Sequence, residues 1–334
     1  MYYVNILTPS LTSDNWFLRQ LDTERYSSVF SFYENSELDI VWDLVIVYEG
    51  INVNKVVKHK KGGLLFISGE PPMSSVYTKN FLDQFDCLLT AHPRLKHKKN
   101  IQSQQALPWH FGKNFNDSSY NYNLRELKEM KIGPKTKNIS VITSSKTMMP
   151  GHNKRIKFLE ELKNNFPDEV DFYGKGVNPV NDKADAILPY RFHLCIENSE
   201  IPNYWTEKLA DPILGLSIPI YIGCTNISDY FPTNSFYHFS LERKNEIFDL
   251  IEKILYEPEQ YYSSKIELLK QDRALIIDDY NIFPVIENLI ASEMSISHTT
   301  TTTALQPNFT FFSYNILLSE LRLKRWILKH LIIN

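Results

Sequence analysis

Short apolar runs alternate with polar, helix-like segments along the first third of the chain. The apolar runs are rich in branched side chains and have the length of buried strands; they occupy residues 4–7, 43–48, 63–68 and 85–90. Helical patterns are expected between them, at residues 15–21 and 79–84. Strands that alternate with short helices favour a parallel, doubly wound sheet.

The same pattern begins again after a polar stretch that ends near residue 135. A second set of strands is predicted at residues 137–143, 170–173, 190–196 and 218–223. Helices are predicted at 153–166 and 206–216, the first with an apolar face built from Ile156, Leu159 and Leu162. The chain is therefore expected to be an α/β protein with two Rossmann-like domains facing across a cleft. Ligands of such sheets bind beyond the carboxyl ends of the strands.

The domain boundaries follow from these repeats. We expect an N-terminal domain at residues 1–135, a second domain at 136–295, and a linker with a tail at 296–334. Residues 298–303 are rich in threonine and predict an exposed linker. Residues 317–333 mix apolar residues with four basic ones, as a membrane-surface helix would. A C-terminal helix packed on the protein explains that pattern equally well.

Composition narrows the class of protein. The 334 residues include 36 Lys and Arg against 39 Asp and Glu, a balance that argues against broad binding of nucleic acid. No apolar run is long enough to span a membrane, and the first residues lack the pattern of a signal peptide. Cys87, Cys195 and Cys224 are widely spread in apolar runs, so we expect buried thiols in a reducing compartment.

The first candidate for chemistry is Glu70. It follows the predicted strand at residues 63–68 and precedes two prolines that end that element. A carboxylate in this position would protrude into a cleft and could act as a general base. A solvated carboxylate in a turn is the plainer interpretation.

The second candidate is a polar cluster after the strand predicted at residues 190–196. Asn198 follows this strand, and Tyr204, Glu207 and Lys208 surround the start of the next predicted helix. The free N–H groups of a helix N-terminus, with the charge of Lys208, suit a phosphate. A capping box closed by Glu207 is the structural alternative.

Arg155 also lies near the expected start of a helix facing the cleft, although a surface role is the simpler reading. Residues 174–176 (GKG) lack the remainder of a phosphate-binding motif and predict a turn. The spacing of Asp182 and Asp185 does not fit a DxD motif, and none of the 9 His has a metal-binding spacing. The sequence therefore predicts no metal site.

Three ordered motifs resemble those of the alpha-1,3-fucosyltransferases, glycosyltransferase family ten. They are YRFHLCIENS at residues 190–199, YWTEK at 204–208 and IPIYIG at 218–223, with Phe-Pro at 231–232. Thinner similarity is found in SGEPP at residues 68–72, FLDQFD at 81–86 and LPW at 107–109. The resemblance extends over about residues 64–239.

The resemblance implies a GT-B enzyme that transfers L-fucose from GDP-fucose with inversion and without an essential metal or other cofactor. Glu70 matches the family's general base, and Arg155 matches an arginine that contacts the donor phosphates. Asn198, Tyr204, Glu207 and Lys208 match donor-binding positions. Lys208 would lie toward the diphosphate and Glu207 toward ribose or sugar hydroxyls.

The expected acceptor is a glycan, with alpha-1,3 linkage to N-acetylglucosamine or glucose. Animal members of the family carry an N-terminal membrane anchor that this chain lacks. We therefore expect a bacterial, cytoplasmic enzyme of lipid-linked or surface glycan synthesis, with peripheral membrane contact through the tail. Three alternatives remain: another nucleotide-sugar donor, a catalytically dead glycan- or nucleotide-binding module, and a tethered interaction protein.

Overall fold

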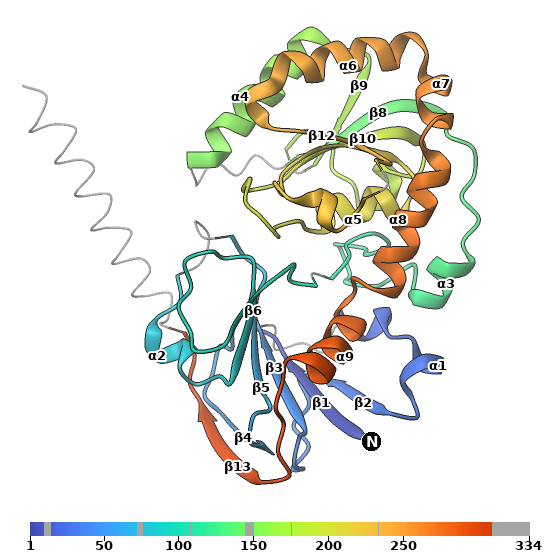
Figure 1. Ribbon diagram of the computed structural model, residues 1–334. Coiled ribbons are helices and arrows are strands. Elements are labelled where there is room, and N and C mark those ends of the chain that lie inside the picture. Colours follow the sequence, from blue (N-terminus) through green and yellow to red (C-terminus); the bar gives the residue numbers. More distant parts are fainter. Residues whose placement is uncertain are drawn as a thin grey trace, which may run out of the picture.

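A computed structural model describes residues 1–9, 15–71, 76–106, 108–143, 150–174, 176–232 and 234–308, without the side chains of 150–153. Within these residues the chain forms two parallel sheets, one on each side of the molecule, and a two-stranded antiparallel ribbon (Figure 1). The strands are β1 (Tyr2–Leu7), β2 (Phe30–Glu34), β3 (Leu44–Tyr48), β4 (Lys55–Lys60), β5 (Leu64–Ser68), β6 (Cys87–Thr90), β7 (Asn100–Gln102), β8 (Lys137–Ile142), β9 (Val170–Tyr173), β10 (Tyr190–Ile196), β11 (Ile218–Ile222), β12 (Tyr237–Phe239) and β13 (Thr300–Leu305). The helices are α1 (Thr23–Tyr26), α2 (Lys79–Leu82), α3 (Leu124–Glu129), α4 (Pro150–Asn165), α5 (Glu207–Leu214), α6 (Lys244–Tyr256), α7 (Pro258–Ser263), α8 (Ile266–Asp278) and α9 (Ile282–Ser292), and short 3-10 turns lie at η1 (Leu18–Gln20), η2 (Lys183–Ala186), η3 (Ile227–Asp229) and η4 (Leu241–Arg243).

The first sheet has the strand order β2-β1-β3-β5-β6-β7, with every neighbouring pair parallel. All residues of β3 and β5 are buried, which explains why their sequences are continuous apolar runs rather than alternating ones. The four strands predicted from these runs are confirmed. The strands β2 and β7, which are only partly buried, were not predicted.

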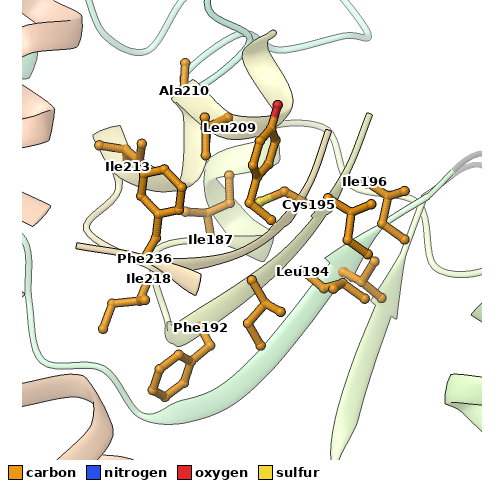
Figure 2. Packing of buried hydrophobic residues seen from close by; sticks show 14 of the residues in the cluster. Ile187, Phe192, Leu194, Cys195, Ile196, Leu209, Ala210, Ile213, Ile218 and Phe236 are labelled. Atoms are coloured by element: carbon orange, nitrogen blue, oxygen red, sulfur yellow. The ribbon is translucent and has the colours of Figure 1, made fainter. Parts of the chain in front are cut away.

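The second sheet has the order β12-β11-β10-β8-β9 and is also parallel throughout. Its core is formed where α5 packs on β10 and β11. Figure 2 shows Leu209 and Ile213 of the helix above Leu194 of β10 and Ile218 of β11. This packing fixes the start of α5 next to the carboxyl end of β10. The strands and the two helices predicted here are confirmed within a few residues.

The C-terminal part of the described chain returns to the first sheet. Helix α9 contributes Ile282, Phe283 and Ile286, all fully buried, to the core that contains β1, β3 and β5. The sequence had placed this helix in the second domain, at residues 136–295. That assignment is wrong for α9, which packs in the core of the first sheet. The boundary near residue 135 remains a prediction.

The threonine-rich segment predicted as part of a linker at 296–334 is in fact the strand β13. It pairs antiparallel with β4, and the side chain of Thr303 bonds His59 Nε2 at 2.9 Å. Threonine is β-branched and fits a half-exposed strand, while Leu305 at the end of β13 is fully buried. The basic tail predicted at 317–333 lies outside the described residues.

Two parallel α/β sheets in separate domains confirm the expected doubly wound, GT-B class of fold. Cys87, Cys195 and Cys224 are free and buried, as predicted. Among the described residues, no helix has both the length and the apolar character needed to cross a membrane.

Substitution Leu305→Ala should lower the free energy of unfolding by about 2–5 kcal/mol, because it leaves a cavity in the core of the first domain. The sequence had assigned Leu305 to a linker, where no such loss would be expected. The exposed neighbour Thr302 provides the control, and Thr302→Ala should change stability by less than about 1 kcal/mol. Chemical denaturation of both variants measures the difference. Equal stabilities would show that β13 contributes little to the first domain.

Candidate active site

A buried carboxylate joins the end of β10 to the start of α5. Glu197 follows β10 and has a fully buried side chain. It accepts hydrogen bonds from the backbone N–H of Thr206 at 2.8 Å and from the Thr206 hydroxyl, whose oxygen lies 2.9 Å from both carboxylate oxygens. No room remains beside it, since a Cβ on Gly223 would lie 2.5 Å from Glu197 Cγ. This carboxylate therefore sets the position of the helix start.

Thr206 is the N-cap of α5, and its hydroxyl oxygen accepts from the backbone N–H of Lys208 at 3.2 Å. The capping-box alternative for Glu207 does not hold. Glu207 is the first residue of the helix, and the residue that would close such a box is Leu209. The carboxylate of Glu207 is thereby left for other partners.

Those partners are two lysines. Glu207 Oε1 lies 3.4 Å from Lys208 Nζ and 3.3 Å from Lys183 Nζ. Burial would raise the pKa of Glu207, but the two ammonium groups outweigh it and hold this pKa well below its usual range. Burial would lower the pKa of Lys208, yet Glu207 and Glu197 raise it above its ordinary value. Glu207 and Lys208 are therefore both ionised at neutral pH.

Arg155 lies on α4, but it is not at the start of this helix as the sequence predicted. The helix begins at Pro150, so Arg155 is on its second turn rather than at its N-terminus. Proline is tolerated in a first turn, which explains the earlier start. The side chain is buried with 8% exposure and donates to Asn198 Oδ1 at 2.9 Å, while its Nε has no hydrogen-bond partner among the described residues. Burial lowers the pKa of Arg155, although an arginine stays protonated.

Arg155, Glu207 and Lys208 line one pocket of about 420 Å³ at the carboxyl ends of β8 and β10. The structure thus brings together three of the six predicted site residues and bonds a fourth, Asn198, to one of them. A loop preceding the second sheet closes one side with His110 and Phe115.

The sequence missed four polar, titratable residues that line this pocket: His110, Lys183, His193 and Asp211. Lys183 Nζ lies 3.2 Å from Asp211 Oδ2, and Asp211 Oδ1 accepts the backbone N–H groups of His110 and Phe111 at 2.9 and 3.0 Å. Two signals were available. His110 directly follows the LPW segment, and Lys183 lies between the two aspartates that failed as a DxD motif.

The charge states of these residues follow from burial. Burial, reinforced by the nearby Lys183, lowers the pKa of His110 to about 3, so the imidazole is neutral at pH 7. Burial raises the pKa of Asp211 to about 6 despite the opposing effect of Lys183. Asp211 therefore protonates in a mildly acidic range, which would weaken its ion pair with Lys183.

The remaining two predicted residues lie elsewhere. Tyr204 is buried, and Glu70 is exposed beyond β5 of the first sheet; neither lines the pocket. Burial raises the pKa of Tyr204, and the charges of Glu197 and Glu70 raise it further, so Glu70 lies within electrostatic reach of the second domain. Pro72, two residues after Glu70, is outside the described residues.

Across the described chain, no group of three or more His, Cys, Asp or Glu side chains could hold a metal ion. The pocket instead gathers cations, with Arg155, Lys183 and Lys208 on its wall. A pocket of this kind at the carboxyl ends of a parallel sheet suits a ligand that carries negative charge.

The fold and the position of this pocket define a GT-B type of two-domain protein. Residues 132–264 match the family model described as glycosyltransferase family 10 (fucosyltransferase), C-terminal part. These residues are therefore a glycosyltransferase family 10 domain, which confirms the resemblance seen in the sequence. The thinner resemblance before residue 132 stays a prediction.

Curated relatives agree over shorter stretches. The human 4-galactosyl-N-acetylglucosaminide 3-alpha-L-fucosyltransferase 9 is 36% identical over 89 residues, which cover 25% of this chain and 24% of the relative. An alpha-(1,4)-fucosyltransferase of Arabidopsis thaliana is 42% identical over 50 residues, covering 15% of this chain and 12% of the relative. The matched region thus spans about a quarter or less of these relatives.

Solved structures with a similar arrangement include an alpha1,3-fucosyltransferase, with a TM-score of 0.49 at 16% identity, covering 83% of this chain and 90% of that one. The same kind of enzyme with GDP-fucose gives a TM-score of 0.47 at 16% identity, covering 85% and 93%.

Substitution Thr206→Val should lower the free energy of unfolding by about 1–3 kcal/mol, because it removes a hydroxyl donor from the buried Glu197 carboxylate. Thr206→Ser keeps this hydroxyl and should stay much closer to the wild type. Chemical denaturation of the pair provides the measurement. A serine variant as unstable as the valine variant would mean that the methyl group, and not the hydrogen bond, matters.

Proposed function

We propose that this protein transfers L-fucose from GDP-fucose to a hydroxyl of an acceptor glycan with inversion at the anomeric carbon. The observation that carries the proposal is the state of Arg155. It is a buried cation on the pocket wall, it forms no ion pair among the described residues, and its Nε has no partner there. An anionic ligand such as a diphosphate would supply the missing partner.

Lys208 supports a diphosphate at the same place. Its ammonium group lies in the pocket wall with 27% of its side chain exposed, held by Glu197 and Glu207 on one side. The bond that breaks during transfer joins the anomeric carbon to a β-phosphate oxygen, and the electron pair leaves with GDP. Cations fixed in advance stabilise the charge that develops on this leaving group. We propose this role for Arg155 and Lys208, and no essential metal.

The other donor contacts are proposed for Asn198, Tyr204 and Glu207. Asn198 already accepts from Arg155, so it would orient the guanidinium toward the phosphates. The Glu207 carboxylate is ionised and can accept hydrogen bonds from hydroxyl groups of ribose or sugar. The buried Tyr204 lies within electrostatic reach of both Glu207 and Glu70.

Glu70 is the proposed general base. Its exposed carboxylate would take the proton from the acceptor hydroxyl while that oxygen attacks the anomeric carbon from the face opposite GDP. A single displacement of this kind inverts the configuration. The position of Glu70 on the first sheet, with the donor pocket on the second, suits an acceptor bound between them.

For the acceptor we propose alpha-1,3 linkage to N-acetylglucosamine or glucose. The human relative is named for transfer to a galactosyl-N-acetylglucosaminide, which supports this choice. A cytoplasmic location and peripheral membrane contact through the tail are proposed on the sequence alone.

A donor and acceptor panel tests the function. Purified protein should turn over GDP-fucose with an N-acetylglucosamine- or glucose-containing acceptor, and NMR of the product should show an alpha-1,3 linkage. Turnover with another nucleotide sugar but none with GDP-fucose would contradict the donor. Binding of GDP-fucose without transfer to any acceptor would favour a catalytically dead module.

Substitution Lys208→Ala should weaken GDP binding and slow transfer together, since its charge meets the diphosphate both before and during the reaction. Loss of one charge-assisted contact costs about 1.5–3 kcal/mol, or roughly 10- to 150-fold in affinity. Lys163→Ala, at an exposed position on α4, is the control. Calorimetry that finds unchanged GDP affinity in a folded Lys208→Ala protein would remove this residue from the donor site.

Substitution Glu70→Gln should reduce the single-turnover rate by about 10²–10⁴-fold, because glutamine keeps the shape but cannot accept the proton. GDP-fucose affinity should hardly change, since the donor pocket is built by the second domain. Glu293→Gln, exposed and outside the pocket, is the control. Near-normal turnover of the Glu70 variant would assign the base to another residue.

A further inference from the structure

A second carboxyl group lies directly behind the turn that carries Glu70. Glu49 follows the last residue of β3, the strand that pairs with β5 in the first sheet. Tyr48 of β3 is paired with Ile67 of β5, so the residues after the two strands leave the sheet side by side. The backbone N–H of Glu49 also donates to the carbonyl of Ile67 at 2.9 Å.

The side chain of Glu49 lies next to the backbone of the Glu70 turn. Its carboxylate faces the backbone N–H groups of Gly69 and Glu70, which act to lower its pKa. It also accepts from the Tyr77 hydroxyl at 3.2 Å, and that hydroxyl oxygen lies 3.3 Å from the hydroxyl of Ser68. The side chain of Glu49 thus lies against this turn, while the carboxylate of Glu70 is exposed.

The backbone at Glu49 is unusual for a residue with a long side chain. Its φ is +66°, in the left-handed region, and Gly50 follows with a φ of +143°. Non-glycine residues in this region are disfavoured unless the surroundings hold them there, and such positions cluster at functional sites. Glycine would suit the backbone better, so the carboxyl group is the feature that needs an explanation.

The titratable groups that act on Glu49 are all acids. Glu70 faces it from the adjacent turn, Tyr77 from the segment before α2, and Tyr204 from the second domain, with Tyr48 beside it in the chain. Burial, and after it the charge of Glu70, raise the pKa of Glu49 to about 8. At neutral pH the Glu49 carboxyl group is therefore largely protonated.

We propose that Glu49 is a positioning residue for the transfer step, which fixes the Gly69–Glu70 turn and so directs the Glu70 carboxylate at the acceptor hydroxyl. This inference rests on the proposed role of Glu70 as the base. The proton of the acceptor goes to Glu70, and no bond to Glu49 forms or breaks. While Glu49 is neutral, the cleft also avoids a second negative charge opposite an anionic donor.

Two variants of Glu49 separate positioning from charge. Glu49→Gly removes the carboxyl group and relieves the backbone, so it should fold; it should lower kcat by about 10²-fold, the cost of a misplaced reacting group, with GDP affinity unchanged. Glu49→Gln keeps an oxygen acceptor and resembles the protonated glutamate, so its kcat at pH 7 should stay close to that of the wild type. Ser118→Gly, at an exposed position with a φ of +60°, controls for the glycine itself.

The pH profile gives a second readout. Ionisation of Glu49 adds a negative charge near the donor, so kcat/KM of the wild type for GDP-fucose should fall above about pH 8. The glutamine variant has no such ionisation and should lack this fall. A role confined to stability would leave the profiles of the two proteins alike.

Amide hydrogen exchange supplies a test that does not depend on the reaction. The amides of Gly69 and Glu70 should exchange faster in Glu49→Gly than in the wild type, and unchanged exchange would overturn the inference even if no acceptor is turned over. Normal kcat in Glu49→Gly, with Glu70→Gln inactive, would overturn it while leaving Glu70 as the base. A Glu49→Gln protein as inactive as Glu49→Gly, with Glu70→Gln active, would make Glu49 the base and overturn both assignments.

Discussion

The geometry of the proposed donor pocket depends on the buried carboxylate of Glu197. Taking a charge out of water is costly, and it is tolerated only when bonds and an opposite charge compensate. Glu197 obtains both from one short segment: the amide and hydroxyl of Thr206, and the ammonium group of Lys208 at 3.6 Å. The carboxylate therefore locks the end of β10 to the first turn of α5. Glu197 lies in the ENS motif, and Thr206 and Lys208 lie in the YWTEK motif, so these interactions join the two motifs.

The lysines of the pocket are already shared among carboxylates, whereas Arg155 is not. Lys183 and Lys208 are paired with Glu197, Glu207 and Asp211, and these pairs hold the lysines in place without a ligand. Arg155 bonds only the neutral amide of Asn198 among its described contacts. An incoming anion would thus meet a preorganised wall and one cation with unused hydrogen-bonding capacity, an arrangement that stabilises charge without further reorganisation.

Sequence reasoning succeeded where one residue type dominates a local pattern. The fully buried strands β3 and β5 are continuous apolar runs, β10 is buried except at Arg191, and the motifs around Asn198 and Lys208 are contiguous. It failed at β4, whose sequence KVVKHK contains three lysines and leaves Val56 and Lys58 exposed, and at β13, whose threonines suggested a linker. Both strands are defined by their pairing with each other, and residues so far apart in the chain leave no local signal.

The same limit applies to the site. Lys183 of η2 and Asp211 of α5 are far apart in the sequence and come together only in the folded chain. The role proposed for Glu49 likewise depends on its proximity to the turn at Gly69 and Glu70. A single glutamate after a strand is indistinguishable in sequence from a solvated one. The two glutamates differ in their surroundings: the carboxyl group of Glu49 faces the backbone of the turn, whereas that of Glu70 is exposed.

The base and the donor pocket are proposed for different domains, so transfer requires that the two domains hold a fixed relation. The structure supplies a continuous connection. Arg19 of the first domain donates to the carbonyls of Trp109 and Phe111, and the amides of His110 and Phe111 donate to Asp211 on α5. Asp211 lies one turn after Lys208 on the same helix, so displacement of the 109–111 segment would be transmitted to the helix that carries the proposed diphosphate contact. The buried Arg19 and Asp211 thereby relate the position of the first domain to the orientation of the proposed donor site.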